Sequence, residues 1–373
     1  MEQGLNSIFK VAIIGAGPAG CLCAYYLQNY FEVTLIDYGK PLRTLLPTGG
    51  GRCNLAHAEY DFRELAKNYF RGEKFLYSIF SKFCTSETIE FFKNIGVETY
   101  TQEDNRIFPI SNSSTEVRDK LLKALNKVKF KQEKVTKLDF TKYDYIVIAT
   151  GGHSSYSLIE NHTIVPPKPA LVGLRTKDLL PQGVTVKRVY SEGFTDDVLF
   201  THEGISGPLI YKISSKYARK EFPYEINLNF FEGINLQEYL NKNPHKSIKN
   251  LLSEFLPKSF ATHVLDALNI DADLKCHQIN GKIRDLITEK LTNYKLCVTG
   301  TSKGGEVVTC GGVSLDEVNS KTMESKITPN LYFCGEVLDI DGLCGGYNLQ
   351  NCWSTAYVAA QGIINKYSKQ QSL

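Results

Sequence analysis

The chain lacks the features that mark membrane, secreted and metal-binding proteins. No apolar run in its 373 residues approaches the ~18 residues needed to span a bilayer. The ten cysteines form no CxxC pair and show no zinc-ligand spacing, so we expect reduced thiols and no metal site. Residues 1–9 lack the basic and apolar segments of a signal peptide. We therefore expect a cytoplasmic protein without a membrane partner.

An excess of one charge is also missing. The chain has 43 Lys and Arg residues against 40 Asp and Glu residues, which leaves a formal net charge of only +3. This charge is too small to favour nucleic acid or an anionic membrane, so we expect a small-molecule substrate and no nucleic acid partner. The length predicts two or three domains with a substantial core and leaves the oligomeric state open.

A glycine-rich fingerprint follows the first apolar segment. Residues 9–14 read as a buried strand and residues 18–30 as a helix; the residues of the turn and the first helical positions are Gly15, Ala16, Gly17, Pro18, Ala19 and Gly20. In this context Gly15 makes the turn, Gly17 lets the backbone approach a pyrophosphate, and Gly20 allows close helix–strand packing. A second predicted strand ends at Asp37, where an acidic side chain accepts hydrogen bonds from the adenosine ribose. A tight turn that binds nothing is the disfavoured alternative.

A second glycine-rich run follows this unit. Three consecutive glycines indicate backbone that passes close to a flat or charged group, although a flexible surface loop is the alternative. Arg52 is suited to phosphate oxygens and Asn54 to a polar ring edge. The cofactor contacts predicted in this segment are Arg43, Thr48, Gly50, Gly51, Arg52, Cys53 and Asn54.

Two later segments complete the predicted site. Residues 127–140 read as strands that carry Val135, and a buried strand then ends in Ala149, Thr150 and Gly151, a turn typical of FAD-binding folds. Near the other end of the chain, a strand over 331–334 leads to Gly335 and Glu336, and a helix is predicted over 349–365. An ordinary docking helix is the alternative here. The residues predicted to hold a cofactor around its start are Asp341, Gly346, Tyr347, Asn348, Leu349 and Gln350.

These motifs together carry a family resemblance. Residues 48–54, 200–208, 321–325 and 335–350 resemble the BaiN-like, aminoacetone-oxidase-type FAD flavoproteins, over about residues 9–362. The resemblance implies non-covalent FAD in a glutathione-reductase-type, Rossmann-like domain, with the C-terminal helix pointing its N-terminus at the flavin. It also implies amine or carbonyl oxidation, or reduction with NAD(P)H as a transient electron donor. The chain departs from the family pattern at Thr48, where Ser is usual, and at Asp37, where Glu is usual.

The middle of the chain contains no second fingerprint, so a reductase with two dinucleotide domains is excluded. Alternating and helical patterns predict an α/β protein whose FAD-binding domain, 1–168 and 310–373, is interrupted by a β-barrel-like unit, 169–232 and 293–309, and a small helical subdomain, 233–292. His202 is a candidate proton donor or acceptor, but a turn before a helix over 208–216 is favoured for its segment. For Cys53 and Cys344, buried inert thiols are favoured over a role beside the flavin.

The leading hypothesis is an FAD-dependent oxidoreductase that acts on a small organic substrate. One alternative is an FAD-binding interaction or regulatory protein without turnover. Another is a flavin-dependent RNA-modifying enzyme, against which the near-neutral charge counts. The substrate, the electron acceptor and the catalytic acid or base stay open.

Overall fold

The computed structural model describes residues 9–152, 156–178, 180–303 and 308–372. The expectation about a signal peptide concerns residues 1–9 and lies almost wholly outside these residues. The chain divides into two compact units. One combines Met1–Lys168 with Val308–Leu373, and the other is Pro169–Val307. Both ends of the chain therefore contribute to the first unit.

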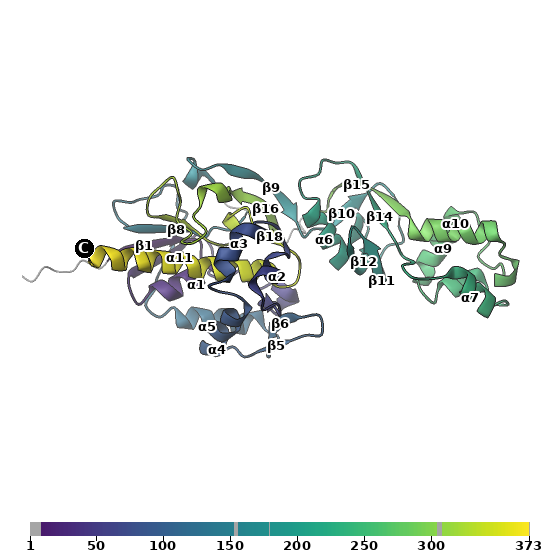
Figure 1. Cartoon of the computed structure of the whole chain (residues 1–373), viewed down its shortest axis with the longest axis horizontal. Coiled ribbons are helices and arrows are strands. Elements are labelled where there is room, and N and C mark those ends of the chain that lie inside the picture. The colour runs from purple at the N-terminus through teal and green to yellow at the C-terminus, as the bar shows by residue number, and fades with distance from the viewer. Residues whose placement is uncertain (1–8, 153–155, 179, 304–307, 373) are drawn as a thin grey trace, which may run out of the picture. The chain divides into compact units, whose positions relative to one another are not determined.

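A five-stranded parallel sheet forms the centre of the first unit (Figure 1). Its strands, in the order of the sheet, are β17 (Leu331–Phe333), β8 (Tyr145–Ile148), β1 (Lys10–Ile14), β2 (Glu32–Asp37) and β7 (Lys129–Gln132). The strand from the C-terminal segment pairs with β8, because Tyr332 lies opposite Val147. This arrangement confirms the predicted α/β class with a Rossmann-type domain.

Two helices at opposite ends of the chain pack against one another in this unit (Figure 1). They are α1 (Pro18–Leu27) and α11 (Tyr347–Gln371). α11 is longer than predicted at both ends. It starts at Tyr347 because Gly346 before it has a left-handed backbone, with φ of 100°. It continues past residue 365 because the Lys and Gln residues that follow are good helix formers.

The strands predicted over 127–140 are shorter than expected. β7 ends at Gln132, and residues 133–144 form no strand, so Val135 lies in an irregular segment and is half-buried against the core. β7 is the edge strand of the sheet and all four of its side chains are exposed. Its lysines suit an exposed edge, where charge opposes pairing with another strand.

Further elements complete the first unit. They are β3 (Ala56–His57), β4 (Tyr69–Arg71), β5 (Thr99–Thr101), β6 (Arg106–Pro109), β9 (Ile164–Ala170, which runs two residues past this unit), β16 (Val308–Val313), β18 (Asp341–Gly342), α2 (Phe62–Ala66), α3 (Glu73–Phe80), α4 (Thr85–Asn94) and α5 (Ser114–Ala124). β18 pairs with β4, and β3 pairs with β6. These pairings join the C-terminal segment and the glycine-rich run to the rest of the unit.

The second unit has its own hydrophobic core around a six-stranded antiparallel sheet. The strands, in the order of the sheet, are β11 (Val184–Ser191), β12 (Phe194–Phe200), β13 (Gly204–Ser206), β10 (Leu174–Thr176), β15 (Tyr294–Thr301) and β14 (Tyr224–Leu228). Tyr190 and Asn229 exchange backbone hydrogen bonds of 2.9 and 2.8 Å. The two outer strands of the sheet therefore meet, as in a small barrel.

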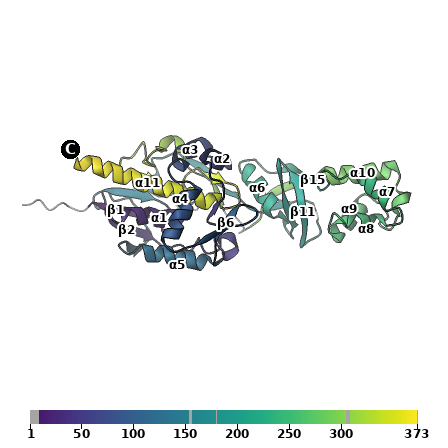
Figure 2. The same cartoon turned by 60° about the horizontal axis from the view of Figure 1, so that its bottom comes forward.

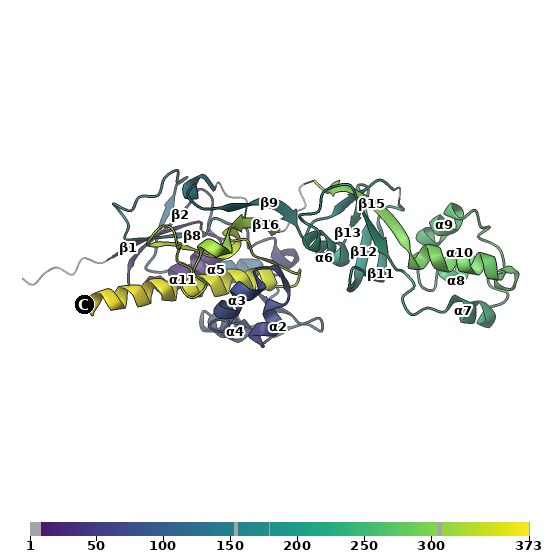
Figure 3. The ribbon, with the colours of Figure 1, turned by 45° about the horizontal axis from the view of Figure 1, so that its top comes forward.

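Five α-helices lie within the described residues of the second unit. They are α6 (Pro208–Lys216), α7 (Leu236–Lys242), α8 (Ile248–Leu252), α9 (Lys258–Ala267) and α10 (Gly281–Thr292). The last four lie together beyond one end of the strands, as Figures 2 and 3 show. Within the described residues of both units, no helix is long and apolar enough to cross a membrane.

Candidate functional site

The fingerprint glycines divide into two that are enclosed and one that is open. A Cβ on Gly15 would lie 2.3 Å from the Ala149 carbonyl oxygen, and a Cβ on Gly20 would lie 1.9 Å from the Gly15 carbonyl oxygen. Around Gly17 the nearest atom would be Thr44 Oγ1, at 3.9 Å. Gly17 is also the N-cap of α1, and no side chain caps that helix. The space beside Gly17, at the uncapped N-terminus of α1, is therefore open and suits a pyrophosphate.

The predicted ribose residue, Asp37, lies at the same turn. Its Oδ2 accepts a hydrogen bond from the Ala16 N–H, and its Oδ1 accepts one from the Gly39 N–H, both at 2.7 Å. These bonds fix the carboxylate and leave lone pairs for ribose hydroxyls. The Arg43 guanidinium lies 5.0 Å from the centre of the exposed Tyr38 ring.

The Gly-Gly-Gly run forms a left-handed turn. The φ values of Gly49, Gly50 and Gly51 are 59°, 68° and 85°, and a Cβ on either of the last two would meet nothing within 4 Å. Thr48 Oγ1 donates to the Leu45 carbonyl at 2.6 Å. The Thr48 hydrogen bond therefore fixes the start of the turn, and the space beside Gly50 and Gly51 is open. Close approach of a flat group requires such open space.

Arg52 does not extend into that open space. Its Nε donates to the Gly49 carbonyl at 3.2 Å, and its guanidinium lies 4.2 Å from the centre of the Phe108 ring. Cys53 is fully buried, and burial raises the pKa of its thiol to about 12. Cys53 is therefore a buried thiol, as expected, and its raised pKa favours the protonated form. Its φ of 64° is unusual for a residue with a side chain.

Asn54 brings the two glycine-rich segments together. With its amide nitrogen facing the carbonyls, it donates to Ala56 at 3.0 Å and Ile107 at 3.2 Å, and its oxygen accepts the Gly346 N–H at 3.0 Å. A Cβ on Gly346 would lie 2.3 Å from the Ala56 carbonyl oxygen. The run after β2 and the start of α11 are therefore in direct contact.

Other predicted residues from the C-terminal half are held by the protein itself. Asn348 Oδ1 accepts the Gly342 N–H at 2.9 Å, and its Nδ2 donates to the Gly342 carbonyl at 3.0 Å. Gln350 is fully buried, where its Oε1 accepts from Thr88 Oγ1 at 3.0 Å. Asp341 is fully buried in a bidentate ion pair with Arg71. The side chains of Asn348, Gln350 and Asp341 therefore bind other parts of the protein and stabilise the structure around the start of α11.

Other predicted positions follow the carboxyl ends of β17 and β8 or lie at the start of α11. Gly335 donates its N–H to Thr355 Oγ1 at 2.9 Å, and Glu336 Oε1 accepts the Thr309 N–H at 2.6 Å. Gly151 has a φ of 77° and open space where a Cβ would lie, beside the half-buried Thr150. Leu349 is half-buried at the start of α11.

Comparison with known proteins identifies the family. Residues 9–362 match the family described as "HI0933-like protein Rossmann domain". The chain belongs to this FAD-binding family. Its cofactor is FAD and it is a flavin-dependent oxidoreductase, which confirms the resemblance in the motifs. The open Gly17 and Gly50–Gly51 surfaces fit this cofactor.

Named relatives cover nearly the whole chain. Ribosomal RNA dihydrouridine synthase of Escherichia coli (strain K12) is 32% identical over 401 residues, which cover 95% of this chain and 98% of the relative. The 3-dehydro-bile acid delta(4,6)-reductase of Clostridium scindens is 25% identical over 413 residues, which cover 96% and 99%. Among solved structures, 3-ketosteroid delta1-dehydrogenase from Sterolibacterium denitrificans, with 12% identity, matches 95% of this chain and 99% of its own with a TM-score of 0.50, a likeness of fold.

His202 lies in the second unit of this flavoprotein. It is an exposed residue of the turn between β12 and β13, in which the Thr201 N–H donates to the Gly204 carbonyl at 2.8 Å. α6 starts at Pro208, as predicted for this segment. Its N-cap is Gly207, and Ser206 Oγ before it donates to Tyr211 Oη at 3.3 Å.

Three side chains of the site were not found from the sequence. Thr44 faces Gly17, Arg71 holds Asp341, and His57 contacts Gly345 and Tyr347. They belong to no sequence motif, because each contacts a residue that is far away in the sequence or on the other side of a turn. The one available signal is position, since His57 follows Asn54 by three residues.

Cys344 differs from the other cysteines. It alone among the ten, all within the described residues, is exposed, so the expectation of a buried thiol is wrong for it. We expect a thiol reagent to modify Cys344 in the fastest step, because it is the most accessible of the ten thiols. Cys344→Ser should remove that step, the partly exposed Cys297 and Cys352 should react more slowly, and the seven buried cysteines should react only after denaturation. A fast step that survives in the variant would contradict this assignment.

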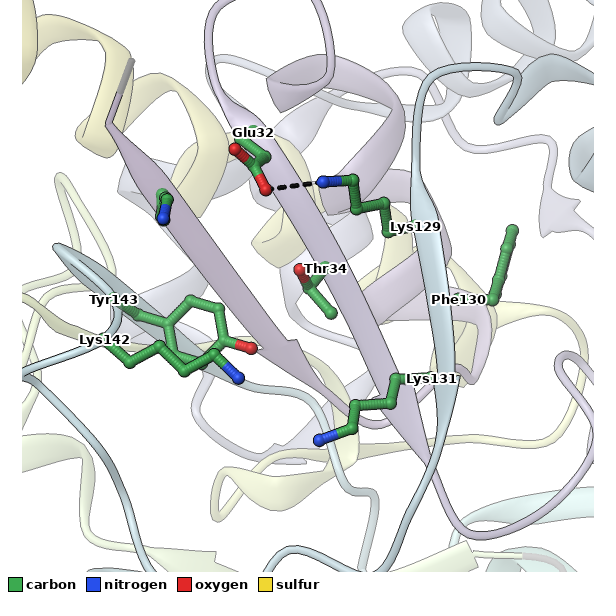
Figure 4. A pocket seen from close by; sticks show the side chains of 8 residues that line it. Glu32, Thr34, Lys129, Phe130, Lys131, Lys142 and Tyr143 are labelled. Carbon is green, nitrogen blue, oxygen red and sulfur yellow. Dashed lines mark hydrogen bonds and ion pairs between the residues drawn. The ribbon is translucent and has the colours of Figure 1, made fainter. Parts of the chain in front are cut away.

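A groove of about 330 Å³ lies elsewhere in the first unit (Figure 4). Lys10, Glu32 and Lys129, the first residues of β1, β2 and β7, contribute to it, and Lys129 Nζ lies 2.7 Å from Glu32 Oε1. The fingerprint follows the opposite, carboxyl end of β1. The groove is therefore not part of the FAD site. Within the described residues no cluster of metal-ligating side chains was found.

Proposed function

We propose that this flavoprotein is a reductase that adds hydrogen across a carbon–carbon double bond conjugated to a carbonyl group. The proposal is based on the class of double bond that the names of both relatives indicate. A dihydrouridine synthase saturates the C5–C6 double bond of uracil, which is conjugated to the C4 carbonyl. A 3-dehydro-bile acid delta(4,6)-reductase acts on double bonds conjugated to the 3-oxo group. The substrates differ in size, but the bond is of one class.

The chemistry balances with an external electron donor. Hydride adds to the β-carbon, a proton adds to the α-carbon, and NAD(P)H is oxidised to NAD(P)⁺. Bound FAD supplies the hydride transfer between donor and substrate. The chain contributes the open α1 N-terminus for the pyrophosphate and the N-terminus of α11, whose partial positive charge stabilises negative charge nearby. It contains no second fingerprint, so NAD(P)H acts as a transient donor.

The substrate we favour is a uridine in ribosomal RNA. The E. coli relative combines 32% identity with coverage of nearly all of both chains. The near-neutral charge of this chain opposes tight non-specific binding to phosphates, but it does not oppose recognition of one base. A small conjugated ketone is the second candidate, supported by the bile acid reductase relative.

An acceptor assay separates these candidates. FAD-loaded protein and NAD(P)H would be incubated with unmodified ribosomal RNA transcribed in vitro or with a panel of cyclic enones. We expect dihydrouridine in the RNA, measured by mass spectrometry of its nucleosides. Reduction of enones alone would favour the second candidate. If the flavin is reduced by NAD(P)H but neither acceptor class is reduced, the reductase proposal is wrong. A Gly17→Val protein without FAD serves as the control.

A further inference from the structure

We propose that His57 and Asn54 are positioning residues that lock one peptide group, the one between Gly345 and Gly346, and so hold the start of α11 ready for the flavin. The proposal rests on FAD binding at this end of the site but not on the identity of the substrate. It is therefore tested without substrate, and its failure is distinguishable from failure of the proposed reductase activity.

The two side chains hold opposite polar atoms of the same peptide. His57 Nδ1 lies 3.1 Å from the Gly345 carbonyl oxygen, and Asn54 Oδ1 accepts the Gly346 N–H at 3.0 Å. A carbonyl oxygen only accepts hydrogen bonds, so His57 Nδ1 carries its proton. Because the carbonyl and the N–H of a trans peptide point in opposite directions, two such bonds fix the orientation of the peptide plane.

This peptide needs an external lock. It is flanked by two glycines, whose φ values are 129° and 100°. Because glycine restricts the backbone less than any other residue, the flanking residues alone do not fix the orientation of this peptide. No side chain caps α11 at Gly346. The two hydrogen bonds from His57 and Asn54 therefore determine the orientation of the first N–H groups of α11, the longest helix of the first unit.

His57 is itself held firmly. Its ring stacks on Tyr347, with centroids 4.5 Å apart and planes 22° apart, and its carbonyl accepts a hydrogen bond of 3.0 Å from Thr85 Oγ1. Burial lowers the pKa of His57. The hydrogen bond to the Gly345 carbonyl and then the carboxylates of Asp104 and Glu59 oppose this effect, and the Arg106 guanidinium supports it. The ring is therefore neutral at pH 7, with its single proton on Nδ1.

A matched pair of variants separates the hydrogen bond from the stacking. His57→Phe keeps an aromatic ring against Tyr347 but loses the donor, whereas His57→Asn loses the ring but places an amide N–H close to the position of Nδ1. We expect His57→Phe to bind FAD about tenfold more weakly than the wild type, the effect of one hydrogen bond, and His57→Asn to recover most of that loss. The midpoint potential of the bound flavin should shift in the same order.

The measurements are FAD titration of the apoprotein and redox titration of the bound flavin. If His57→Phe binds FAD as well as or better than His57→Asn, the ring rather than the hydrogen bond is important and the lock is excluded. Asn54→Ala tests the joint action. Once one partner is lost, loss of the second should cost less, so the combined weakening in the double variant with His57→Phe should be smaller than the product of the single effects. A fully multiplicative result would overturn the lock.

Discussion

Replacing Gly17 by valine is expected to give a folded protein that no longer retains FAD. The backbone at Gly17 has φ of −78°, which any residue adopts, and a Cβ there would lie no closer than 3.9 Å to another protein atom. The protein alone therefore tolerates the side chain. The same side chain would occupy the space beside the α1 N-terminus in which we expect the pyrophosphate to bind.

We expect FAD affinity to fall about 100-fold or more, equivalent to ~2.8 kcal/mol. FAD retained after desalting and titration of the apoprotein measure the loss, and circular dichroism checks the fold. Gly20→Ala is the matched control, because its Cβ would lie 1.9 Å from the Gly15 carbonyl oxygen. That variant should lose stability as well as FAD. Stoichiometric FAD in Gly17→Val would show that the pyrophosphate lies elsewhere.

Replacing Arg71 by methionine is expected to cost about 3–5 kcal/mol of the free energy of unfolding, the usual effect of removing one partner from a buried ion pair. Asp341 has no exposed surface and Arg71 is only 14% exposed at its side chain, and the pair joins β4 to β18. A carboxylate without its bidentate partner would remain in an interior that solvates charge poorly. Urea denaturation of the apoprotein measures the change.

Two further variants show whether the charge or the shape is responsible. Arg71→Lys keeps the charge but loses the two-pronged geometry, so we expect an intermediate loss of stability. The double variant Arg71→Met with Asp341→Leu removes both charges and should be more stable than Arg71→Met alone, because no carboxylate is left without its partner. If Arg71→Met stays within about 1 kcal/mol of the wild type, the ion pair is not a support of this segment.

The first half of the site follows from local rules. The strand, turn and helix from residue 10 to residue 27 depend on contacts between residues close in sequence, so the spacing of Gly15, Gly17 and Gly20 predicts both the turn and the open position in it. The boundaries of α6 in the second unit were likewise predicted, because the helix expected over 208–216 spans Pro208–Lys216. Apolar periodicity and caps are local signals.

Side-chain roles were harder to predict than backbone positions. Arg52 and Asn54 lie where the motif places them, yet Arg52 stacks on Phe108 and Asn54 bonds to Gly346. Both partners come from other elements of the fold. The identity of a side chain shows what it is able to bind, whereas its neighbours decide what it does bind.

The sequence by itself determined the family, the cofactor and the glycine-rich turn before α1, because these depend on residue types at short spacings. Only the tertiary structure decided how the two glycine-rich segments join. Its decisive contacts are Asn54 with Gly346, His57 with Gly345 and Arg71 with Asp341, and the last two pairs are 288 and 270 residues apart. No local pattern encodes such pairs, because strand pairing and helix packing across the whole unit bring them together.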